Sequence, residues 1–310
     1  MLDAVAFLAT RRKRDSVKRY LAKLQWDGKR RLRKWLVRYL GAEDTPLNRA
    51  IGELMLVALV SRALRPGVKF DHLIVLVGAQ GGGKSTALRT IAVRKSWFSD
   101  QDILHLGARE QQELLQGVWL YEVSELAGMS KADAAKFKAF VSRQTDRARQ
   151  AFGRMRFDQD RNGILVGTCN EPTFLTDTTG NRRVLPVQVG AIRLKALRRV
   201  RDQLLAEAVI LANGKPPLRL PRKLWAAAAK VQAERMLEDP WMERLEGLCR
   251  DRDRIPFAEI AQGLGLSFDR QSVSIAKRVA DCMRRLGFER RSFKLAGRVV
   301  RGYVRASTPQ

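Results

Sequence analysis

The sequence predicts an α/β fold in which helices cover a parallel sheet, with a helical segment before it and a small basic domain after it. Three short apolar runs, bounded by glycine or polar residues, indicate the sheet: residues 72–78, 117–123 and 163–168. Continuous apolar runs of this length are typical of strands buried on both faces. Residues 184–189, VLPVQV, are expected to form a fourth strand.

Helices are predicted before and between these strands. Between residues 14 and 64 apolar side chains recur at helical spacing, and Gly41 is a suitable stop for one of the helices. Residues 130–141 are expected to form a helix between the second and third strands. Its expected buried stripe is Ala134, Phe137, Phe140 and Val141.

The last third of the chain has a different pattern. A linker around residues 213–221 leads into a helical stretch, and residues 257–266 and 271–287 are expected to form two further helices. A basic hairpin over 288–305 follows, which predicts a winged-helix-like domain. The candidate DNA contacts on its second helix are Lys277, Arg278, Arg284 and Arg285.

The charge of the chain indicates a polyanionic partner. Lys and Arg total 59 against 32 Asp and Glu, a formal net charge of +27 over 310 residues. Such a field attracts nucleic acid, because each neutralised phosphate releases counterions. An anionic membrane surface is the second class of partner that this charge allows.

Neither a membrane span nor a disulfide framework is expected. The most apolar helical stretch, residues 51–64, contains Glu53 and Arg62 and is too short to span a bilayer. The N-terminal apolar run is too short for a signal peptide. The three cysteines are far apart and fit a reducing compartment, so the expected location is the cytoplasm.

The stretch GAQGGGKS, residues 78–85, fits the phosphate-binding pattern GxxxxGKS/T between a strand and a helix. Glycines let backbone N–H groups approach phosphates closely, and the start of the following helix adds a positive dipole end. Lys84 is expected to reach the β- and γ-phosphates of ATP, and Ser85 to hold Mg²⁺. The remaining expected nucleotide contacts are Gly78, Gly81, Gly82, Gly83 and Thr86.

The second strand brings two acids to its end, Glu122 within the strand and Glu125 just after it. A carboxylate there can hold the water shell of Mg²⁺, and another can polarise the attacking water. Glu122 and Glu125 are the candidates, and the division of these roles between them stays open. The alternative is that Glu122 and Glu125 are glutamates of an exposed loop without a catalytic role.

Asn170 follows the third strand, where a polar side chain can orient the attacking water. Arg182 and Arg183 come twelve and thirteen residues later. Either of them can act as an arginine finger, which neutralises charge on the transferred phosphoryl group. If the finger acts in trans, the active sites lie between subunits. The alternative is that both arginines belong only to the basic surface.

These motifs together resemble the virulence-associated protein E family, whose members are similar to the superfamily III helicases of phages and integrated elements among the AAA+ ATPases. The resemblance covers residues 16–190 and continues at DPW, residues 239–241. It is carried by WDGKRRL (26–32), Pro66–Gly67, GAQGGGKS, SWFSD (96–100), YEVSEL (121–126), KAFVSRQTDRARQAFGR (138–154) and GTCNEPTFLTDTTGNRRVLPV (167–187).

The resemblance implies roles for these residues. Lys84 and Ser85 match the Walker A positions, Glu122 the Walker B acid, Asn170 the sensor, and the Arg182–Arg183 pair the finger. A hairpin before the sensor strand is expected to hold single-stranded DNA in a central channel through Arg149, Arg154, Arg156 and Arg161. Longer relatives carry a primase-like region upstream, so priming activity is expected to be absent here, and the need for a separate primase stays open.

The expected domains are a helical domain at 1–66, an AAA+ P-loop ATPase core at 67–212, a helical linker at 213–252 and a winged-helix-like domain at 253–310. The expected function is that of an ATP-driven DNA translocase or helicase, a hexamer that replicates a phage or mobile element. One alternative is an ATP-switched initiator or loader that does not unwind DNA. A small-molecule kinase is a further alternative, although the basic charge argues against it.

Overall fold

The chain folds into two compact units, residues Met1–Met236 and Leu237–Gln310. The computed structural model describes residues 16–103, 105–124, 126, 131–149, 156–175, 181–237, 239–266, 273–295 and 297–306. Helices before residue 66 share one buried apolar cluster with the central sheet, so they belong to the first unit. The division into four domains stays a prediction.

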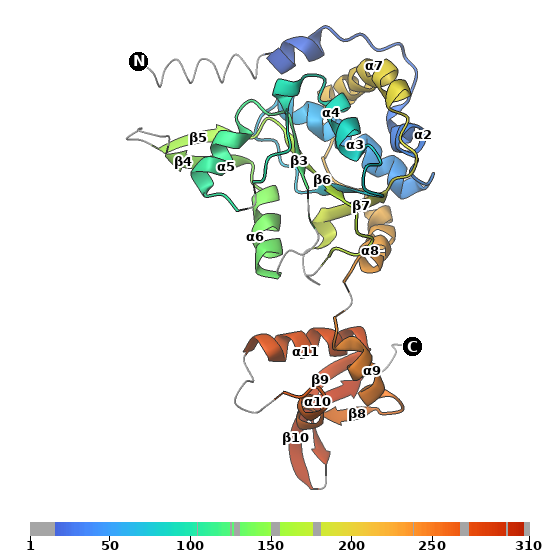
Figure 1. The fold of residues 1–310 in the computed structure, drawn as a ribbon, viewed down its shortest axis with the longest axis vertical. Coiled ribbons are helices and arrows are strands. Elements are labelled where there is room, and N and C mark those ends of the chain that lie inside the picture. The colour runs from blue at the N-terminus through green and yellow to red at the C-terminus, as the bar shows by residue number, and fades with distance from the viewer. Residues whose placement is uncertain are drawn as a thin grey trace. The chain divides into compact units, whose positions relative to one another are not determined.

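The first unit contains a parallel sheet of five strands (Figure 1). In spatial order the strands are β2 (Phe98–Ser99), β3 (Leu120–Val123), β6 (Ile164–Cys169), β1 (Leu73–Val77) and β7 (Val184–Gln188). Every residue of β1, β3 and β6 is buried, as expected for strands covered on both faces. The predicted α/β class and its parallel sheet are confirmed.

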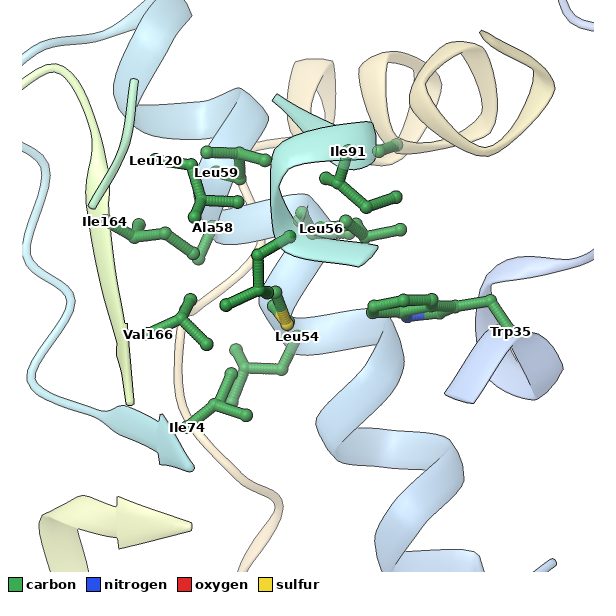
Figure 2. Close-up of a cluster of buried hydrophobic side chains, with 14 of the residues drawn as sticks. Trp35, Leu54, Leu56, Ala58, Leu59, Ile74, Ile91, Leu120, Ile164 and Val166 are labelled. Carbon is green, nitrogen blue, oxygen red and sulfur yellow. The ribbon is translucent and has the colours of Figure 1, made fainter. Parts of the chain in front are cut away.

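One face of the sheet is covered by α2 (Trp35–Leu40), α3 (Pro46–Leu64), α4 (Lys84–Ile91) and α7 (Leu194–Asn213). Residues 16–22 are also helical, and a short 3-10 turn, η1 (Leu32–Lys34), precedes α2. Figure 2 shows Ala58 of α3 beside Ile164 of β6, and Leu56 of the same helix on the side of Ile91 of α4. As predicted, Gly41 ends α2, in the left-handed conformation with φ 67°.

The opposite face is covered by α6 (Lys131–Val141), whose Phe137, Phe140 and Val141 are buried in a second apolar cluster. This confirms most of the stripe predicted for that helix. Helix α6 leads into an antiparallel hairpin of β4 (Thr145–Arg149) and β5 (Arg156–Asp160). The other elements of this unit are η2 (Lys95–Trp97), α5 (Ala108–Leu115), η3 (Asn181–Arg183), η4 (Arg222–Leu224) and α8 (Trp225–Glu234).

Arg62 of α3 is a buried cation that joins several loops. Its side chain is 1% exposed, and it donates to the carbonyls of Val68, Phe70, Gly163 and Arg143 at 3.1–3.4 Å. Burial, together with the neighbouring Arg161, lowers the pKa of Arg62 to about 10. The guanidinium therefore satisfies carbonyl groups where the chain enters β6 and where it leaves α6.

The second unit has its own core and a three-stranded antiparallel sheet in the order β8-β10-β9. Its elements are α9 (Met242–Cys249), β8 (Arg254–Pro256), α10 (Phe257–Gly263), α11 (Val273–Arg285), β9 (Phe288–Leu295) and β10 (Arg298–Arg305). The two helices and the hairpin predicted from the sequence are present. Among the described residues of the whole chain, no helix has the length and apolar character needed to cross a membrane.

Candidate functional site

The glycine-rich loop after β1 has the backbone of an anion cradle. Gly81 and Gly83 have φ angles of 73° and 89°, which a residue with a side chain rarely adopts. Gly83 is the N-cap of α4 and offers no side-chain acceptor to the first amides of that helix. Since these amides carry a partial positive charge and no side-chain cap, this end of α4 favours a negatively charged ligand.

Lys84 lies beneath this loop, with only 6% of its surface exposed. Its Nζ donates to the carbonyls of Gly78 and Ala79 at 2.7 and 2.8 Å and to Asn170 Oδ1 at 2.8 Å. Burial lowers the pKa of the Lys84 ammonium, while Cys169 and Glu122 act in the opposite direction. Three oxygen acceptors thus hold one cation at the base of the loop.

Glu122 is the centre of a second polar group beside Lys84. Its Oε1 accepts hydrogen bonds from Ser85 Oγ at 2.6 Å and from Thr168 Oγ1 at 2.7 Å. The residue is 2% exposed, and its Oε2 has no hydrogen-bond partner among the described residues. A buried carboxylate oxygen without a partner is costly and is well placed to interact with a cation or water. Sequence reasoning did not find Thr168.

The parallel sheet explains why these residues meet. Val77, the last residue of β1, is opposite Cys169 on β6, so the glycine loop and Asn170 leave the sheet at the same edge. Glu122 on β3 is opposite Val166, two residues before Thr168 on the same strand β6. Loops at the carboxyl ends of neighbouring parallel strands converge on one crevice, which is where ligands bind in sheets of this kind.

The two arginines of the predicted finger lie at the opposite end of the strands, just before the amino end of β7. Strand β7 is parallel to β1, with Val184 opposite Leu73 and Gln188 opposite Val77. Arg182 and Arg183 precede Val184, so about 13 Å of strand separates their level from the start of the glycine loop. Neither arginine belongs to the cluster around Lys84. The second predicted acid, Glu125, lies outside the described residues.

The two arginines differ in their surroundings. Arg183 is half-buried, and its Nη1 donates to the carbonyl of Lys138 on α6 at 3.4 Å. Lys138 Nζ in turn donates to Asn181 Oδ1 at 2.8 Å, which fixes the turn before β7. Arg182 is exposed. Of the pair, Arg182 is therefore the side chain directed to solvent.

The predicted DNA-binding hairpin forms between β4 and β5. Arg149 and Arg156 are cross-strand partners in the last described pair before its turn. Arg154 lies outside the described residues. The hairpin thus places two of the predicted arginines at directly opposite positions of its two strands.

Arg161 has to be removed from the set of predicted DNA contacts. It is 4% exposed, and its Nε and Nη2 donate to the two carboxylate oxygens of Asp146 at 2.7 and 2.8 Å. Its guanidinium also lies 4.3 Å from the ring centroid of Phe140. A buried, paired guanidinium is not available to a phosphate. Arg161 instead anchors the base of the hairpin.

We expect Asp146→Ala to destabilise the first unit by about 3–5 kcal/mol, because it leaves the Arg161 charge buried without its carboxylate. Urea unfolding, followed by circular dichroism, measures this loss. Asp158→Ala is the matched control on the same hairpin, since Asp158 forms an exposed pair with Arg147 and should matter little. Equal losses for the two variants would contradict a structural role for the buried pair.

In the second unit, Lys277, Arg284 and Arg285 are exposed on α11, as predicted. Arg278 is committed to its own unit, because its guanidinium bonds both carboxylate oxygens of Asp239 and lies 3.9 Å from the ring centroid of Trp241. The hairpin carries further exposed bases that the sequence analysis did not select. They are Arg290, Arg291, Lys294, Arg298 and Arg301. The high frequency of basic residues in the two predicted strands of the hairpin could have identified them from the sequence.

Comparisons with known proteins give one family and a shared fold. The profile of the virulence-associated protein E-like domain matches residues 21–237. The apo structure of the NrS-1 C-terminal region (305–718) is similar with a TM-score of 0.52 and 13% identity, covering 92% of this chain and 78% of that chain. An A-form apo structure of the same region gives 0.48 and 13%, covering 93% and 78%. None of the curated proteins compared matches the chain.

Proposed function

The chain belongs to the virulence-associated protein E-like family, and on that premise we propose that it is an ATP-driven DNA translocase, with a P-loop of the AAA+ type, that serves the replication of a phage or mobile element. The observation that carries the proposal is the contact of Lys84 with Asn170, beside the Ser85–Glu122 pair. A cation, a hydroxyl, a carboxylate and an amide converge there on one glycine-rich loop. Phosphoryl transfer needs these groups and little covalent chemistry.

In this proposal the loop amides and Lys84 bind the phosphates of ATP. Lys84 Nζ donates to three uncharged oxygen atoms, and negatively charged phosphate oxygens are stronger acceptors that can take their place. Asn170 Oδ1 would then be released to orient the attacking water. Glu122 or Glu125 accepts the proton of that water.

The residues present fit a magnesium ion bound together with phosphate. Ser85 Oγ and Glu122 Oε2, which has no hydrogen-bond partner in the described part of the chain, are hard oxygen donors, and Mg²⁺ usually takes one or two such protein ligands besides phosphates and water. Ser85 and Glu122 would hold the ion. When bound, it would neutralise charge that develops on the phosphate oxygens.

The position of the arginines supports an oligomer. Arg182 precedes the amino end of β7, whereas its own glycine loop follows the carboxyl end of β1, so as a finger Arg182 would act on the site of a neighbouring subunit. A head-to-tail arrangement of this kind closes into a ring when the rotation between subunits allows it. We propose a hexameric ring with Arg182 as the finger.

Two parts of the chain are proposed to hold DNA. The β4–β5 hairpin presents Arg149 and Arg156 at one level, and backbone contacts from such arginines track a strand without selecting a sequence. The second unit, with its helices and a basic hairpin, is proposed to be a winged-helix domain that contacts duplex DNA. The net charge of +27 supports both contacts.

We expect single-stranded DNA to stimulate ATP hydrolysis and the protein to displace a labelled strand from a forked duplex. Phosphate release and gel separation of the strands measure the two activities. Stimulation without displacement would favour the initiator or loader instead. Absence of DNA-stimulated hydrolysis would contradict the proposal. Both activities should fall steeply as salt rises, because phosphate contacts release counterions.

A further inference from the structure

A groove of about 680 Å³ crosses the surface of the first unit, between α3 and the segment that joins α7 to α8. Its apolar wall is formed by Leu54 and Val57 of α3 and by Leu218, Leu220 and Trp225 across from them. Pro216, Pro217 and Pro221 lie along the joining segment. Because proline fixes its backbone φ, these three residues restrict the conformations of the segment that lines the groove.

Trp225 is an aromatic ring that the fold leaves open to solvent. The residue is 54% exposed, although a Trp side chain usually finds an apolar environment. Its Nε1 donates to the carbonyl of Leu220 at 3.2 Å, which sets the orientation of the ring. The guanidinium of Arg222 lies 5.6 Å from the ring centroid. A ring held this way beside a cation is suited to stack on a planar ligand.

The rim of the groove is strongly positive. Among the described residues, its basic side chains are Arg33, Arg219, Arg222 and Lys223, and its acidic side chain is Glu53. Glu53 already lies 3.8 Å from Arg33. The other three bases are exposed, and no carboxylate among the described residues pairs with them. The groove therefore combines its apolar wall with a rim of basic residues, most of which no carboxylate of the described residues neutralises.

We propose that this groove binds single-stranded nucleic acid, with a base stacked on Trp225 and the phosphates along Arg219, Arg222 and Lys223. Aromatic side chains flanked by basic residues are the usual means of holding a nucleic-acid strand without regard to its sequence. An acidic peptide would satisfy the charge, but it would not account for the fixed, exposed ring beside a guanidinium. The groove is separate from the β4–β5 hairpin, and its binding does not depend on ATP hydrolysis.

The test measures binding of a fluorescein-labelled oligothymidylate to the full chain without nucleotide, by fluorescence anisotropy. Trp225→Ala is expected to weaken binding about five-fold or more, and Trp225→Phe to weaken it less because a ring remains. Arg222→Ala with Lys223→Ala should reduce the salt slope by about 1.4. The control is Lys230→Ala, which removes an exposed base of α8 outside the groove and should leave the affinity unchanged.

Photocrosslinking locates the strand directly, so that other DNA contacts of the chain do not hide the result. An oligonucleotide with bromodeoxyuridine should crosslink to the peptide that contains Trp225. Unchanged affinity of Trp225→Ala, with no crosslink in residues 215–225, would overturn the proposal. A poly-glutamate peptide that binds the wild type but not Trp225→Ala, with oligothymidylate binding intact, would assign the groove to an acidic protein. Thermal unfolding checks that each variant is folded.

Discussion

Lys84→Ala is expected to reduce ATP turnover at least about 100-fold, the loss typical of removing one preorganised group that stabilises transition-state charge. The side chain is the one cation that the structure shows at the base of the glycine loop among the described residues, with contacts to Gly78, Ala79 and Asn170. Its removal leaves the β- and γ-phosphates without that charge. Phosphate release under saturating ATP and DNA measures the effect.

Lys230→Ala provides the control, because Lys230 is an exposed lysine of α8 and has no part in the contacts around Lys84. It should hydrolyse ATP like the wild type. Binding of a fluorescent ATP analogue and thermal unfolding separate a lost charge from a lost fold. A folded Lys84→Ala protein that retains its turnover would reject the assignment of the loop.

Arg182→Ala is expected to reduce turnover about 1,000-fold or more, within the range found for arginine fingers, with nucleotide affinity unchanged. Arg183→Ala should have a smaller effect, because that guanidinium contacts the carbonyl of Lys138 within its own subunit. Steady-state hydrolysis and analogue binding measure the two quantities. Equal inactivation by both variants would show that the turn before β7 acts as a unit.

A mixing experiment tests whether Arg182 acts across subunits. Arg182→Ala and Lys84→Ala proteins, each inactive alone, are combined in equal amounts and allowed to exchange. In randomly mixed rings, about a quarter of the interfaces have an intact Lys84 facing an intact Arg182. Partial recovery of hydrolysis is therefore expected. No recovery in rings shown to be mixed would exclude completion of the site by a neighbour.

Much of the sheet and of the polar cluster could be predicted, because the relevant signals are local. Continuous apolar runs marked β1, β3, β6 and β7, and the glycine pattern marked the loop before α4. Glu122 and Asn170 are 48 residues apart, yet each follows or ends an apolar run. Parallel pairing places such ends at one edge, so their meeting with Lys84 follows from the topology.

The remaining features depend on contacts that the sequence does not reveal. Arg161 looks like any other base of a charged stretch, and only the register of β4 and β5 brings Asp146 to it. Helix α7 carries a buried stripe between many basic residues, which obscured its periodicity. The exposure of Trp225 is the reverse of what its apolar ring suggests. Each case requires the tertiary structure.

The base of the β4–β5 hairpin is fastened at several points. Asp146 on the first strand holds Arg161 just past the second, the Arg161 carbonyl accepts from Gly67 N at 2.9 Å, and Arg62 holds the carbonyl of Gly163. These contacts restrain the root of the ribbon against bending relative to the sheet. If the hairpin holds DNA as proposed, it would advance a strand by moving together with the first unit and not by swinging on its own.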